Sequence, residues 1–171
     1  MPLCAAAGAA VLLLKLALPL VPLPAECGVP ADVEVAPVYR PVIERLVTRS
    51  PTLCAQMRRI AADDRVVLRI VVAHGLRPGA CCRASTRFVR RGVRLEANVR
   101  LPASAELPEL LAHELEHVVE QIEGLDLVRL SRVRDSGVYR IEGNRFETLR
   151  AQAAGRAARQ ELETIAFDAR R

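Results

Sequence analysis

Apolar residues change their spacing several times along the chain, and each change predicts a different element of secondary structure. Between Val38 and about Ala62 they recur at helical spacing, and Pro51 divides this stretch into two helices or one broken helix. Ser50 is placed to cap the second half. Residues 66–73 are then a β-branched, apolar run, which predicts a buried strand.

Two further strands are predicted in the middle of the chain, over residues 83–90 and 92–101, with a turn at Arg91-Gly92. In the second of them apolar and polar residues alternate. The apolar positions are Val93, Leu95, Ala97, Val99 and Leu101. Strict alternation is typical of an antiparallel strand with one buried face, so we expect a small antiparallel sheet.

Helical spacing returns after these strands. Ser104 is a candidate N-cap for a helix over residues 105–123, which Gly124 ends. Residues 125–141 form a looser segment, and a last helix is predicted over residues 144–169. Helices, then a small sheet, then helices predict an α+β fold.

The N-terminal stretch differs from the rest of the chain. Residues 5–24 are almost wholly apolar, with Lys15 as the one charged residue, and a small residue follows. This composition predicts a signal peptide over residues 1–25, with an uncleaved membrane anchor as the alternative. A linker over residues 26–36 then leads to a single domain over residues 37–171. We therefore expect a secreted or periplasmic protein, or one anchored in a membrane and facing away from the cytoplasm.

Charge and composition narrow the classes of partner. The net charge is +5, but the arginines are scattered among apolar positions and only 3% of the residues are aromatic. Nucleic-acid binding favours a clustered basic stripe with aromatic rings for stacking, so no nucleic-acid partner is expected.

Cysteine usage agrees with export. An even number of cysteines remains after the predicted leader, which favours disulfides in an oxidising compartment, although four cysteines allow three pairings. These residues are Cys27, Cys54, Cys81 and Cys82.

The strongest chemical signal is the pentad His113-Glu114-Leu115-Glu116-His117. Histidines four residues apart on a helix lie one turn apart on one face and can share a metal ion. Glu114 lies about 100° round the helix from His113, where it can take a proton from a metal-bound water. The apolar stripe of this helix lies on the opposite side, at Leu111, Leu115, Val118 and Ile122. The histidines therefore face a cleft and not the core.

The run from Leu111 to Val118, Leu-Ala-His-Glu-Leu-Glu-His-Val, resembles the active-site helix of zincin-type zinc metallopeptidases. The resemblance extends from the strand over residues 93–101 to the C-terminal helix. It implies a zincin-like domain in which that strand is the edge strand that runs antiparallel to bound substrate. It also implies Zn²⁺ as the cofactor, with a third protein ligand and water in the fourth position.

The third ligand is expected to be a glutamate, because no histidine follows His117 and the gluzincin-like form takes a glutamate from a following helix. Glu147, in the first turn of the predicted last helix, is the favoured candidate. Glu142 is the alternative, while Glu161 and Glu163 are distant ones.

Together with the predicted signal peptide, the resemblance implies an exported peptidase that hydrolyses peptide bonds with a zinc-activated water and with Glu114 as general base. Tyr139 is a candidate stabiliser of the developing oxyanion, with Arg140 and Arg145 as alternatives. Glu116 and Glu120 are expected on a solvated face, although either could hydrogen-bond a ligand histidine. The alternative function is a metal-binding or peptide-binding module with a zincin-like site and no turnover. The expected partner is a peptide or protein substrate, with the membrane as a partner only if the N-terminal segment is an uncleaved anchor.

Overall fold

The structure is a computed structural model that describes residues 27–73 and 84–168. The predicted leader over residues 1–25, and both Cys81 and Cys82, lie outside the described residues. The helices are α1 (Arg40–Arg49), α2 (Pro51–Ala61), α3 (Leu107–Ile122), α4 (Leu127–Leu130) and α5 (Leu149–Asp168). The strands are β1 (Glu34–Val35), β2 (Val66–Ala73), β3 (Ser85–Arg91), β4 (Arg94–Pro102), β5 (Val138–Glu142) and β6 (Arg145–Thr148). Among the described helices, none combines the length and apolar character needed to span a membrane.

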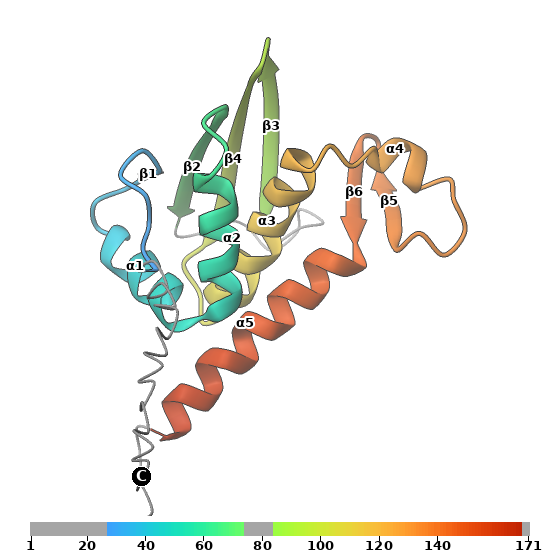
Figure 1. The fold of residues 1–171 in the computed structure, drawn as a ribbon. Helices are drawn as coiled ribbons and strands as arrows, with labels where there is room; N and C mark the ends of the chain where they lie inside the picture. Colours follow the sequence, from blue (N-terminus) through green and yellow to red (C-terminus); the bar gives the residue numbers. More distant parts are fainter. Residues whose placement is uncertain (1–26, 74–83, 169–171) are drawn as a thin grey trace, which may run out of the picture.

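The main sheet is mixed and has the strand order β1-β2-β4-β3 (Figure 1). Strands β1, β2 and β4 run parallel, and β3 pairs antiparallel with β4 across a tight turn at Gly92, whose φ is +60°. The prediction of an antiparallel sheet was therefore right for β3 and β4 but wrong for β2. Alternation reports that one face of a strand is buried, and it carries no information on the direction of the neighbouring strand.

This strand order also places at the edge of the sheet a different strand from the one that was expected. Strand β4, which was expected at the edge, lies between β2 and β3. The strand that lies at the edge of the described sheet beside β4 is β3.

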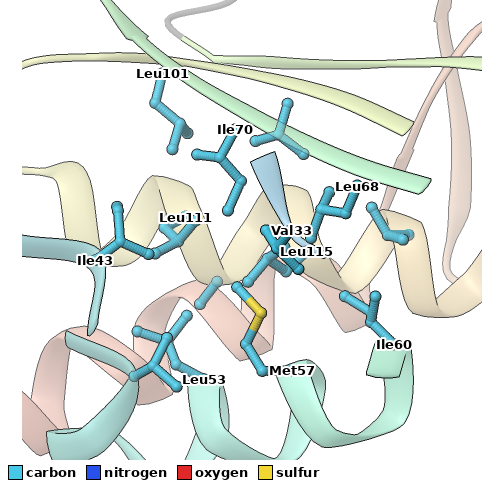
Figure 2. Packing of buried hydrophobic residues seen from close by; sticks show 14 of the residues in the cluster. Val33, Ile43, Leu53, Met57, Ile60, Leu68, Ile70, Leu101, Leu111 and Leu115 are labelled. Atoms are coloured by element: carbon cyan, nitrogen blue, oxygen red, sulfur yellow. The ribbon is translucent and has the colours of Figure 1, made fainter. Parts of the chain in front are cut away.

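Helices α1, α2, α3 and α5 contribute side chains to an apolar core that lies between these helices and one face of the main sheet. Figure 2 shows apolar side chains of β2 and β4 above those of the helices. From the sheet, Leu68, Ile70 and Leu101 point into this layer, and from α3 Leu111 and Leu115 do so, all at most 2% exposed. The apolar stripe predicted for the histidine helix is therefore the side that faces the core.

The break between the first two helices is confirmed. Ser50 ends α1 and caps α2, because its hydroxyl oxygen accepts a hydrogen bond from the Leu53 amide at 3.1 Å. Glu161 of α5 reaches the same turn, where its carboxylate accepts hydrogen bonds from the hydroxyls of Ser50 and Thr52. The C-terminal helix is thus fastened to the start of α2.

The segment predicted as a linker contains the short strand β1. Val33 is buried before it, and Arg40 donates hydrogen bonds to the carbonyls of Val33 and Pro30, both at 3.0 Å. A disulfide joins Cys27 to Cys54 on α2, with Cα atoms 5.4 Å apart. This segment is therefore held against α1 by the hydrogen bonds of Arg40 and joined covalently to α2.

The last predicted helix begins later than expected. Residues 145–148 form strand β6, which pairs with β5 in a separate two-stranded hairpin turned at Gly143, whose φ is +54°. Helix α5 begins at Leu149, and the Thr148 hydroxyl accepts a hydrogen bond from the Ala151 amide at 2.9 Å. A threonine hydroxyl in this position satisfies an amide that has no partner within the helix, so the helix starts there.

Helices α3 and α5 approach closely because small residues line their contact. Ala151 and Ala158 are fully buried. A Cβ atom added to Gly155 would lie 2.9 Å from the backbone oxygen of Glu109 and 3.5 Å from Cβ of His113. The backbone of α5 therefore touches the part of α3 that carries the first histidine.

Candidate metal centre

Three potential metal ligands converge at one end of the β5–β6 hairpin. His113 and His117 come from adjacent turns of α3, and Glu147 comes from β6. One donor atom from each can be chosen so that all three lie within 4.8 Å of one another. The Glu147 carboxylate lies 3.3 Å from His113 Nε2 and 3.8 Å from His117 Nε2.

These separations suit a shared cation. Two ligand atoms bound to one tetrahedral zinc ion lie about 3.3 Å apart when each bond is about 2.0–2.1 Å long. Two imidazole nitrogens and one carboxylate oxygen form a donor set that zinc and several other divalent metals accept. The group could therefore hold a metal ion, and the described donors leave the identity of that ion open.

Glu147 reaches the histidines from a strand, although a helix was expected to carry it. Its carboxylate also accepts a hydrogen bond from the Thr148 amide at 2.8 Å. Burial raises the pKa of Glu147, but the hydrogen bond and charge of His113 outweigh this effect, so that its pKa lies below the usual value of 4.5. The side chain is thus set to carry a negative charge between the two imidazoles.

His117 is oriented by a chain of buried hydrogen bonds. Its Nδ1 lies 2.9 Å from the carboxylate of Glu120, which is fully buried, and Glu120 in turn accepts a hydrogen bond from the Thr148 hydroxyl at 2.6 Å. This arrangement directs Nε2 of His117 toward Glu147. Burial lowers the pKa of His117, but the hydrogen bond and charge of Glu120, with smaller effects of Glu114 and Glu147, raise it overall above 6.5.

The acidic side of α3 is therefore not solvated, and this expectation was wrong. Glu116 is 7% exposed, accepts a hydrogen bond from the Gln56 side chain at 2.6 Å and forms an ion pair with Arg150. Arg150 also pairs with Glu123 at the end of the helix. Helix α2, strand β6 and helix α5 cover this side, and they provide the partners that its buried carboxylates require. The second expectation, that one of these carboxylates contacts a histidine, agrees with the position of Glu120.

Glu114 lies beside the three donors without joining them. It is 5% exposed, and its carboxylate accepts a hydrogen bond from the Thr86 hydroxyl on β3 at 2.6 Å. Burial raises its pKa above the usual 4.5, against the opposing effects of Thr86 and of the two histidines. A carboxylate in this state binds a proton more readily than an exposed one does.

Tyr139 lies on β5 directly across the hairpin from Glu147. Its side chain is 51% exposed and is not among the described residues that line the cavity at this centre. Its proposed role with the oxyanion stays a prediction. Glu142 ends β5, and its side chain lies outside the described part of the structure.

A cavity of about 560 Å³ opens at the donor group. Thr86 and Phe88 of the edge strand line it, as do His113, Glu114 and His117 of α3 and Glu147 of β6. Its size falls within the range of about 300–1,000 Å³ that is typical of ligand pockets. The donors therefore face a space that a ligand could enter.

No known protein family, no curated protein and no solved structure matches this chain. The chemistry of the centre is therefore inferred from its own residues.

Sequence reasoning missed the threonines that hold the site. Thr86 and Thr148 lie in strands and bind Glu114 and Glu120 by their hydroxyls. One signal was available for Thr148, because a threonine just before an alanine-rich helical stretch is a typical N-cap. Thr86 had no such signal, since its partner is 28 residues away.

Proposed function

We propose that this protein is a zinc-dependent peptidase of zincin-like type, in which His113, His117 and Glu147 hold the metal ion. The observation that carries the proposal is the convergence of these donors beside a separate, buried carboxylate in an open cavity. A site that only stored a metal would not need a carboxylate that stands beside the donors without joining them. A bound zinc ion would supply a Lewis acid that polarises a carbonyl group and acidifies a water molecule.

Glu114 is the proposed general base. It lines the cavity with the donors, where its carboxylate could take a proton from the attacking water and return it to the leaving amine. The Thr86 hydroxyl fixes the orientation of the carboxylate. Because Thr86 belongs to β3, this hydrogen bond holds the base next to the edge strand.

The edge strand supports a peptide as the substrate. Strand β3 lies at the edge of the described sheet and contributes Thr86 and Phe88 to the cavity. An extended peptide can add to such an edge through backbone hydrogen bonds, which places its backbone along the site. The zincin resemblance assigned the edge strand beside bound substrate to residues 93–101. Because β3 lies at the edge instead, the proposal assigns that role to residues 85–91.

The test measures metal content and hydrolysis in the same samples. The full chain is purified without chelators, its metals are counted by elemental analysis, and a mixed peptide library is digested and analysed by mass spectrometry. We expect about one zinc ion per chain and cleavage products. E114Q should keep the metal and lose at least about 100-fold in rate, within the range for a general base. The matched control E109Q changes a glutamate on the same helix that is outside the cavity lining.

Two results would contradict the proposal. Wild-type protein without stoichiometric metal would remove the metal centre itself. Full zinc loading together with no cleavage by either wild type or E109Q would favour the alternative, a metal-binding or peptide-binding module without turnover.

A further inference from the structure

Part of the cavity at the metal centre is lined by large apolar side chains that are half-buried or exposed. They are Phe88, Leu125, Leu127, Val128, Ile141 and Phe146, and we name this group the apolar subsite. Val128 is 46% exposed and Ile141 is 50% exposed. Large apolar side chains open to solvent within a cavity are a recurrent mark of binding sites.

The position of the apolar subsite follows from contacts along the edge strand. Thr86 bonds to Glu114, and Arg90 donates a hydrogen bond to the backbone oxygen of Gln121 at 3.2 Å. Phe88 lies between them on the same face of β3, because side chains alternate along a strand. Its neighbour on α3 is therefore the turn that carries His117, so the apolar subsite begins next to the metal centre on the C-terminal side of α3.

The other members of the apolar subsite come from the turn after α3 and from the β5–β6 hairpin. Gly124 ends the turn after α3 with a φ of +73°, and Leu125 and Leu127 follow it. Ile141 and Phe146 come from the β5–β6 hairpin, and Phe146 immediately precedes Glu147. Three separate parts of the chain thus contribute apolar side chains to the lining of the same cavity as the metal centre.

Charge at the cavity offers little competing selectivity. Apart from the metal-centre residues, the charged side chains among the described residues of its lining are Asp126 and Arg145, which have opposite signs. Asp126 is occupied locally, since its carboxylate accepts a hydrogen bond from the Arg129 amide at 2.9 Å and caps α4. Among the described residues at this end of the cavity, apolar side chains therefore provide most of the contact that a substrate side chain would make.

We infer that the substrates are peptides with a large apolar residue, such as Leu, Ile, Phe or Met, beside the scissile bond. This inference rests on the proposed peptidase function and adds the substrate class to it. Removing a favourable apolar contact in such a pocket typically changes kcat/KM by about 10- to 200-fold.

The test compares peptides that differ only in that one residue. Zinc-loaded wild-type protein should cleave beside Leu or Phe at least about 10-fold better than beside Asp or Gly. V128D and I141D should each reduce this preference by about 10-fold or more. Both positions are half exposed, so the variants should fold, and equal zinc content and circular dichroism will verify this.

V133D is the matched control, because Val133 is 54% exposed in the same part of the chain but does not line the cavity. Cleavage without an apolar preference, or V128D behaving like V133D, would overturn the subsite while leaving the peptidase function intact. If wild type cleaves nothing, binding of the same peptides to zinc-loaded E114Q, measured by fluorescence polarisation, tests the apolar subsite separately. Tighter binding of the Leu peptide than of the Asp peptide, lost in E114Q/V128D, would support the subsite, and equal binding would overturn it.

Discussion

The Thr148 hydroxyl links the metal centre to the start of the C-terminal helix, and its removal should weaken both. The hydroxyl donates a hydrogen bond to Glu120 at 2.6 Å and accepts one from the Ala151 amide at 2.9 Å. Thr148→Val keeps the shape and the β-branch but removes both bonds. The backbone amide that binds Glu147 remains.

The expected loss of stability is about 3 kcal/mol. Loss of the helix cap costs about 1 kcal/mol. Loss of a hydrogen bond to a buried charge costs a further ~1.5–3 kcal/mol, and Glu120 is fully buried, so water cannot replace the missing donor. A looser Glu120 also leaves His117 less well oriented, which typically lowers metal affinity by about 10- to 100-fold.

Urea unfolding in the presence of a chelator measures the first effect, and competition with a zinc indicator measures the second. Thr148→Ser should restore most of both, because it keeps the hydroxyl. Thr164→Val, on the exposed part of α5, should change stability by less than about 0.5 kcal/mol. If Thr148→Val unfolds at the same urea concentration as wild type and binds zinc equally well, the Thr148 hydroxyl has neither role.

Three further outcomes are expected. Gly155→Val should cost about 1–3 kcal/mol in urea unfolding, because the added side chain meets the backbone of α3 at Glu109, and unchanged stability would contradict that contact. The Arg150 hydrogen bond holds the pKa of Glu123 below 4.5. The pair of Arg150 and Glu123 therefore stabilises the fold above pH 4.5, and this stabilisation is lost as the pH falls through the lowered pKa. Glu123→Gln should therefore cost up to about 1 kcal/mol at pH 7 and progressively less in acid, and a constant difference across a pH series of urea titrations would argue against this pair. Reduction of the Cys27–Cys54 disulfide, which spans 27 residues, should lower stability by about 3–4 kcal/mol in thermal melts, whereas C27A should not respond to the reductant at this site.

Local patterns in the sequence determined the elements whose own apolar residues follow a regular helix or strand spacing. The apolar run over residues 66–73 is strand β2 with the same bounds, and Ser50 caps α2 as its position before Pro51 predicted. The helix predicted to carry the pentad began two residues too early and ended one residue too late. Its apolar stripe faces the core as predicted. These features depend on interactions within a few residues, or on the simple rule that apolar faces are buried.

Only the tertiary structure decided which elements meet. Periodicity identifies a buried face, but it does not identify the segment that covers that face, so the parallel pairing of β2 with β4 and the burial of Glu120 were both unexpected. Glu147 illustrates the same point. Its residue type and its distance from the pentad singled it out, yet the turn at Gly143 and the cap at Thr148 place it on a strand. The donor group exists because the fold places β6 beside α3, and no local pattern encodes that position.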